Sequence, residues 1–143
     1  MAMRYLDACV IIDFLRGRSP ELYDLFKRAN PKLIAVPSVV VAELFCGAEK
    51  SADPQAAREA VEEFLLPFQV VPFDWRCTYQ YGKIRAALER QGKAIGGNDM
   101  LIAATALAND AVLVTNNVRE FRRVPGLSLE SYTVVNTESE DDE

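Results

Sequence analysis

Histidine is absent from this 143-residue chain, and cysteine is scarce. The lack of histidine excludes a Ser-His-Asp or Cys-His nucleophile, a pair of histidine general acids and bases, and an imidazole zinc site. The three cysteines, Cys9, Cys46 and Cys77, are too far apart to indicate a disulfide framework or a CxxC metal site, so we expect buried free thiols in a reducing compartment. Any hydrolytic chemistry in this chain must therefore use carboxylates.

Long apolar runs are also missing. No stretch approaches the ~18 apolar residues that cross a bilayer, and no basic segment precedes a hydrophobic one at the start, which predicts a cytoplasmic protein with no membrane partner. Five of the 21 acidic residues fall within the last six positions, so the rest of the chain balances its 16 basic residues. We expect one α/β domain over residues 1–135 and an acidic, disordered tail over residues 136–143.

Strand-like and helix-like segments alternate along the chain. Short apolar runs predict strands at 3–6, 33–36, 68–73, 111–114 and 127–132. Helical spacing, with capping residues and breakers at the ends, predicts helices over 10–16, 20–29, 39–48, 54–66, 75–91 and 99–108. This alternation is typical of a three-layer α/β/α fold with a central, mainly parallel sheet, in which ligands bind at the carboxyl ends of the strands. Asp7 and Asn117 both fall at such ends.

Three acidic residues are candidates for a functional site. Asp7 directly follows the first strand, where it either points into the crevice or caps the next helix. Glu43 has apolar or small neighbours at every helical spacing, so its burial requires a cation, a proton or an arginine partner. Asp99 stands at the start of an apolar helix. It either caps this helix, a role that Asn98 could share, or belongs to the functional site. The glycine pair at 96–97 indicates close backbone approach, an unusual turn or a flexible loop.

Convergence of these three carboxylates would create a site that needs a cation. Like charges about 4 Å apart repel by about 4 kcal/mol at an effective dielectric constant near 20. Oxygen-only ligands favour Mg²⁺ or Mn²⁺, which retain water ligands and bind substrate phosphates. The chemistry that such a site predicts is hydrolysis of a phosphodiester bond.

Four sequence motifs also carry a resemblance that covers nearly the whole chain. They are Tyr5 to Ile12; Ser38 to Leu44 with Gly47 to Ser51; Ile95-Gly96 with Asp99 to Ala104; and Leu113 to Asn117 with Phe121 and Val124 to Leu127. In this order they resemble the PIN-domain ribonucleases of the VapC toxin type. Residues 1–135 would then be the PIN domain.

The resemblance implies a metal-dependent endoribonuclease that is the toxin of a type II toxin-antitoxin pair. By resemblance, Asp7, Glu43 and Asp99 bind Mg²⁺ or Mn²⁺, and Asn117 matches the fourth site position, where it would position water or metal. Thr115 would orient the site by hydrogen bonding. The resemblance further implies a homodimer, cleavage of structured RNA such as tRNA, and a cognate antitoxin protein that wraps and neutralises the toxin.

The sequence departs from the family pattern at three places near this site. Ala8 stands where a hydroxyl residue is usual, and Cys9 stands where a polar residue is common. Asn117 replaces a frequent aspartate and lowers the charge of the site by one. We expect Ala8 and Cys9 to leave the site without one of the family's hydrogen bonds, while Asn117 leaves open whether one or two metal ions bind.

Other functions stay open from the sequence alone. One is a PIN-type nuclease that acts on DNA, and another is a non-catalytic module with an acidic binding pocket. Two groups of basic residues near the crevice either contact RNA phosphates or form solvated helix faces. These residues are Arg119, Arg122 and Arg123 in one group and Lys83, Arg85, Arg90 and Lys93 in the other.

Overall fold

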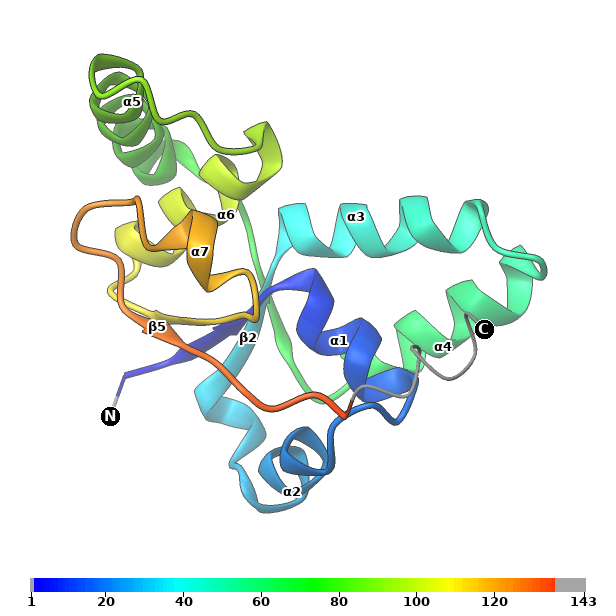
Figure 1. Cartoon of the computed structure of the whole chain (residues 1–143). Coiled ribbons are helices and arrows are strands. Elements are labelled where there is room, and N and C mark those ends of the chain that lie inside the picture. Colours follow the sequence, from blue (N-terminus) through cyan, green and yellow to red (C-terminus); the bar gives the residue numbers. More distant parts are fainter. Residues whose placement is uncertain (1, 136–143) are drawn as a thin grey trace.

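The computed structural model describes residues 2–135, and the acidic tail expected over 136–143 lies outside the described residues. Strands and helices alternate along nearly the whole described chain (Figure 1). The strands are β1 (Arg4–Leu6), β2 (Ile34–Pro37), β3 (Gln69–Val71), β4 (Val112–Val114) and β5 (Leu129–Glu130). The helices are α1 (Ala8–Leu15), α2 (Pro20–Arg28), α3 (Ser38–Glu49), α4 (Pro54–Leu65), α5 (Trp75–Arg90), α6 (Gly97–Ala108) and α7 (Val118–Phe121), with a 3₁₀ turn at Pro31–Leu33.

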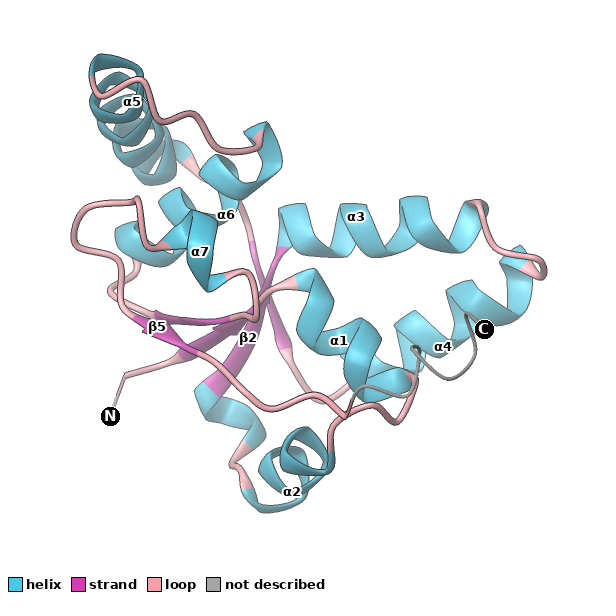
Figure 2. Cartoon of the chain, in the orientation of Figure 1, coloured by secondary structure: helices cyan, strands magenta, loops and turns pink. Residues whose placement is uncertain are grey.

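The sheet of the described chain has the strand order β3-β2-β1-β4-β5, and every pairing in it is parallel. Helices α5, α6 and α7 lie on one side of it and α1, α2 and α4 on the other (Figure 1). The predicted three-layer fold with a central parallel sheet is therefore confirmed. Figure 2 shows the short strands gathered at the centre of the molecule. β1 lies between β2 and β4 in the sheet. The chain therefore continues from β1 to one face of the sheet and from β4 to the other, and a crevice opens between these two connections at the carboxyl ends of the strands.

Burial on both faces explains why the strands appear as continuous apolar runs rather than alternating patterns. Leu6, Val36 and Leu113 come from three different strands, and each is fully buried. Phe121 is also fully buried and anchors the short helix α7 against the core. Phe14 and the aromatic rings near it pack edge to face or tilted, which fixes α1 against α2 and α4.

Side-chain caps fix the start of three helices, as their sequences predict. Ser19 accepts a hydrogen bond from the backbone of α2, Asp53 from that of α4 and Asp74 from that of α5. Each cap satisfies a backbone N–H that has no partner within the helix. No helix within residues 2–135 is long and apolar enough to span a bilayer.

Several details differ from the sequence-based expectations. Helix α1 begins at Ala8 rather than residue 10, and α6 begins at Gly97 rather than residue 99. Helix α7 and the 3₁₀ turn are unexpected, because elements this short leave no periodic pattern. The expectation of buried thiols is wrong for Cys46, which is exposed on α3, whereas Cys77 is buried and Cys9 partly buried.

Candidate active site

Asp7 lies where β1 and β4 end side by side. Its backbone N–H donates to the carbonyl oxygen of Val114 at 3.0 Å, and the residue is only 6% exposed. Asp7 Oδ1 accepts from the backbone N–H of Ala8 at 2.9 Å, while Oδ2 accepts from Thr115 Oγ1 at 2.7 Å. The two interpretations of Asp7 are therefore compatible, because one oxygen caps α1 and the other belongs to a polar cluster after β4.

Thr115 and Cys9 hold this polar cluster together. Thr115 is fully buried, and its Oγ1 also accepts from the backbone N–H of Asn117 at 2.9 Å. Cys9 Sγ donates to Asp7 Oδ2 at 3.5 Å and accepts from the backbone N–H of Asn116 at 3.5 Å. Burial, and then the charge of Asp7, raise the pKa of the Cys9 thiol, so this thiol stays neutral. Cys9 thus supplies hydrogen bonds at a position where the family pattern has a polar residue.

Glu43 projects from the middle of α3 and is half-buried. Its Oε1 is buried without a hydrogen-bond partner in the described chain. Burial, and then the negative charge of Asp7, raise the pKa of Glu43. The alternative of a structural arginine partner does not hold, because no ion pair to Glu43 forms among residues 2–135.

Asp99 lies in the first turn of α6, opposite the end of β4. Asn117 Nδ2 donates to Asp99 Oδ2 at 3.4 Å and to Glu120 Oε2 at 3.2 Å. Burial, a hydrogen bond shared with Glu120, and the nearby charges of Asp7, Glu120 and Glu43 raise the pKa of Asp99 from 3.8 to about 7. The same shared hydrogen bond lowers the pKa of Glu120. Asp99 therefore keeps its proton to a higher pH than an ordinary aspartate does, because its loss would place another negative charge beside Asp7, Glu43 and Glu120.

Glu120 is a member of this cluster that the sequence interpretation missed. Its spacing from Asn117 is three residues, which places both side chains on one side of a helical turn. That signal is visible only once α7 is known to be helical, and α7 is a helix of just four residues.

The glycine pair at the start of α6 consists of two residues in different surroundings. A Cβ on Gly96 would lie 3.4 Å from Asp99 Oδ2, which is an ordinary van der Waals contact with that side chain. At Gly97 a Cβ would meet nothing within 4 Å. Gly96 is also the N-cap of α6, and no side chain caps that helix. The interpretation of Asp99 and Asn98 as caps is therefore wrong.

An open cleft brings two of the candidate carboxylates to one surface. The cleft has a volume of about 480 Å³ and is lined by Glu43, Asp99 and residues 96–98. The charges of Asp7 and Glu43 both act on Asp99 across this region. Within residues 2–135, however, no three acidic or thiol side chains are close enough to form a ready-made metal cage. Glu43 and Asp99 therefore line the cleft, and Asp7 is not one of its lining residues.

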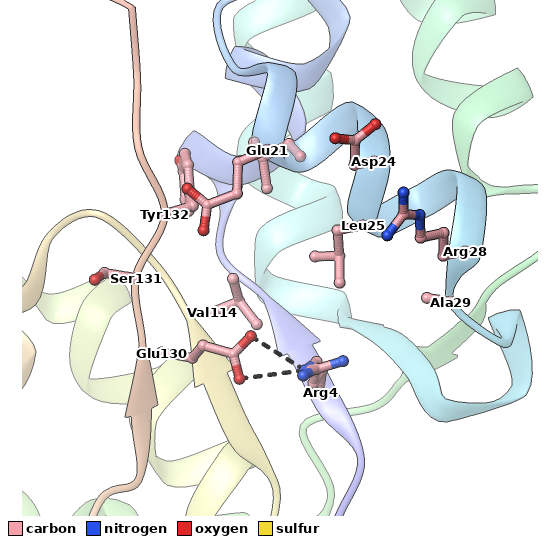
Figure 3. A pocket seen from close by; sticks show the side chains of 11 residues that line it. Arg4, Glu21, Asp24, Leu25, Arg28, Ala29, Val114, Glu130, Ser131 and Tyr132 are labelled. Atoms are coloured by element: carbon pink, nitrogen blue, oxygen red, sulfur yellow. Dashed lines mark hydrogen bonds and ion pairs between the residues drawn. The ribbon is translucent and has the colours of Figure 1, made fainter.

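A second hollow, of about 370 Å³, lies apart from these carboxylates. It is bounded by α2 and by the strands β1 and β5 (Figure 3). Arg4 Nε forms an ion pair there with Glu130 Oε1 at 3.2 Å, so the charge of this cation is already neutralised. None of the sequence-predicted site residues lines this hollow.

The family model of the PIN domain matches residues 4–127, which include every residue of the cluster. The chain belongs to the PIN domain family. The match covers strands β1 to β4 and the seven helices of the described chain, and it ends just before β5. The PIN domain therefore accounts for the fold and for the segments that carry the site.

Named relatives of this PIN domain are ribonucleases of the VapC type. The chain is 42% identical to ribonuclease VapC2 of Rickettsia felis over 118 residues, which are 81% of this chain and 88% of that protein. It is 34% identical to the tRNA(fMet)-specific endonuclease VapC of Salmonella typhimurium over 127 residues, which are 89% of this chain and 96% of that protein.

A solved structure shares both the sequence pattern and the architecture of this PIN domain. It is the structure of VapBC2 from Rickettsia felis bound to a DNA fragment from its promoter. The TM-score is 0.83 and the sequence identity 35%, and the alignment covers 92% of this chain and 99% of the other. The expected resemblance to VapC-type PIN domains is therefore confirmed.

Proposed function

We propose that the carboxylates around the cleft form the active site at which this VapC-type endoribonuclease hydrolyses RNA with a divalent cation, Mg²⁺ or Mn²⁺. The observation that carries the proposal is the buried Oε1 of Glu43, which has no protein partner in the described chain. A buried carboxylate oxygen without a donor is costly, and a cation removes that cost. Asp7, Glu43 and Asp99 would hold the ion, since hard oxygen donors match the preference of both metals.

A bound cation of this kind supplies charge stabilisation at the attacked phosphate and activation of water. The protein's own part is to position the oxygens around it. Thr115 fixes the orientation of Asp7 through the 2.7 Å hydrogen bond. The amide of Asn117 bridges Asp99 and Glu120 and so sets the relative placement of these carboxyl groups. Asp99 must lose its proton before it acts as a ligand, because metal ions bind the deprotonated form.

The proposal extends to the biological role of the chain. The chain would be the toxin of a type II toxin-antitoxin pair, act in the cytoplasm as a homodimer, and cut structured RNA such as tRNA. The tRNA(fMet)-specific relative supports a structured RNA substrate, and the similarity to VapBC2 supports a cognate antitoxin partner. Co-expression with the product of an adjacent small open reading frame, followed by sizing of the purified complex, tests the partner and the dimer together.

Cleavage of total cellular RNA and of purified tRNA by the antitoxin-free protein tests the activity. We expect discrete cuts with Mg²⁺ or Mn²⁺, none in EDTA and none with Asp99→Asn. Asp24→Asn is the matched control, because it removes the same charge from an exposed position on α2 and should leave cleavage unchanged. Matched DNA oligonucleotides separate a PIN nuclease that acts on DNA. A folded wild-type protein that cuts neither nucleic acid would support a binding role instead.

A further inference from the structure

A basic pocket lies between the end of α7 and the connection from α5 to α6. Its volume is about 470 Å³. The residues that line it, called the basic pocket below, are Gln91, Lys93, Arg119, Arg122 and Arg123. These residues come from two chain segments, and the same two segments continue into the carboxylate cluster. Lys93 lies in the connection that leads to Asp99 at the start of α6, while Arg119 precedes Glu120 on α7.

The cations of this pocket are largely free of counter-charges. Lys93, Arg119 and Arg122 are exposed and form no ion pair or side-chain hydrogen bond with any described residue. Arg123 differs, because its Nη1 donates to the carbonyl oxygen of Ala94 at 3.2 Å and ties the two segments together. The pocket is therefore held in shape by one arginine while its other cations face solvent.

The other basic group expected near the crevice behaves differently. Arg85 is engaged by Glu89 Oε2 at 3.2 Å and by Tyr81 Oη at 3.0 Å. Lys83 and Arg90 do not line the pocket, so they fit the solvated-face interpretation. Outside its last six positions the chain has as many acidic as basic residues, so this pocket is a local concentration of charge rather than a consequence of net charge.

We propose that the basic pocket binds the phosphodiester backbone of the RNA substrate next to the bond that is cut. This inference rests on the proposed ribonuclease function and adds the surface that positions the substrate. The pocket lining contains guanidinium, ammonium and amide donors and no apolar side chain. Such a surface suits phosphate oxygens, because arginine donates pairs of hydrogen bonds to them. A protein partner is less well matched, since protein interfaces bury apolar and aromatic side chains at their centre.

Contacts of this kind position a nucleic acid without reading its bases. Glu120 lies on α7 together with Arg119, and Asn117 is the N-cap of this helix, so a strand held at the pocket would be directed toward the carboxylate cleft. The negatively charged carboxylates by themselves repel RNA, and the adjacent cations offset that repulsion. We therefore expect the pocket to strengthen binding of different RNAs to a similar degree.

A salt series of RNA binding tests the proposal. The test variant combines Lys93→Gln, Arg119→Gln and Arg122→Gln, and leaves Arg123 in place because it ties the segments together. The matched control removes three exposed cations elsewhere by combining Lys27→Gln, Lys32→Gln and Lys83→Gln. Fluorescein-labelled tRNA is titrated with each protein in EDTA, which blocks cleavage under the proposed function, and Kd is measured by anisotropy from low to high salt.

Each lost phosphate contact lowers the slope of log Kd against log salt by about 0.7 to 0.9. The test variant should therefore show a slope smaller by about 2 and a Kd roughly tenfold to a hundredfold weaker at physiological salt. The slope of the matched control should differ from that of the wild type by no more than the contribution of about one phosphate contact. Arg119→Lys with Arg122→Lys preserves the charge and should keep the slope as well, which attributes the smaller slope of the test variant to its lost charges.

Cleavage kinetics separate failure of this inference from failure of the proposed function. With saturating metal, the test variant should raise KM for tRNA while kcat stays within about threefold, as expected for lost ground-state binding. An unchanged slope and KM in a cleaving protein would overturn the pocket assignment alone. If those values are unchanged but binding of the antitoxin is lost, the pocket belongs to the protein partner. A wild-type protein that neither binds nor cuts RNA would overturn both.

Discussion

Replacing Asp99 with asparagine should stabilise the metal-free protein at neutral and alkaline pH while it abolishes RNA cleavage. The pKa of Asp99 is raised from 3.8 to about 7 by burial, by the hydrogen bond shared with Glu120 and by neighbouring carboxylates. A carboxyl group with a higher pKa in the folded state contributes stability that is present below its unfolded pKa. That contribution is lost as the pH rises through about 7.

The magnitude follows from the pH range over which only the folded protein keeps this proton. Within the interval from about pH 5 to about pH 8, this range runs from about pH 5 up to the folded pKa of about 7 and so spans about two pH units. The loss in the free energy of unfolding is therefore at most about 3 kcal/mol. Asp99 is half-buried, so solvent screening lowers the expected difference to about 1 to 2 kcal/mol. At roughly 3 °C for each kcal/mol, the wild-type Tm should fall by about 3 to 6 °C relative to Asp99→Asn over this interval.

Thermal unfolding in EDTA at the two pH values measures this effect, with Asp24→Asn as the control for loss of an exposed aspartate. The Tm of the control should fall with pH as much as that of the wild type, and the Tm of Asp99→Asn should fall less. Addition of Mn²⁺ at the higher pH should raise the Tm of the wild type and of the control but hardly that of Asp99→Asn. If the Tm of the wild type and that of Asp99→Asn depend equally on pH, the reasoning is refuted, because the pKa of Asp99 would then not be raised in the folded protein.

Three further predictions follow from the same cluster and from the cysteines. Mn²⁺ affinity measured by calorimetry should increase about tenfold from pH 6 to pH 8, since the Asp99 proton, with a pKa of about 7, must leave before the metal binds. Thr115→Val should slow tRNA cleavage about tenfold to a hundredfold and lower the free energy of unfolding by about 1 to 3 kcal/mol in urea, because Asp7 Oδ2 loses its buried hydroxyl donor. In the native protein a thiol reagent should modify the exposed Cys46 quickly and the buried Cys77 only after unfolding, as mass spectrometry of digests would show.

The fold was predictable from local sequence signals to a large extent. Apolar runs such as Ile34 to Val36 indicate strands buried on both faces, and the caps Ser19 and Asp74 mark where helices begin. Alternation of these elements requires crossover connections, which make the sheet parallel and place its functional edge at the carboxyl ends of the strands. Asp7 could be placed at that edge for this reason alone.

Short elements and long-range contacts were less predictable. A four-residue helix such as α7 has no measurable period, so the place of Glu120 beside Asn117 was not visible in the sequence. Cys46 has apolar neighbours in sequence, yet it faces solvent because tertiary packing, not local composition, selects the buried face of α3.

The sequence by itself determined which chemistry was available. Without histidine, hydrolysis depends on carboxylates, and the places of Asp7 after a strand and of Asp99 at a helix start follow from the order of the elements. Only the tertiary structure decided how those carboxylates interact. Desolvation and like-charge repulsion depend on distances between segments far apart in the chain. The raised pKa of Asp99, and the Glu43 Oε1 that has no partner among the described residues, therefore arise only when α3, α6 and α7 meet around the end of β1. The same meeting of segments gathers Lys93 and Arg119 into one basic pocket, which sequence spacing could not distinguish from a solvated face.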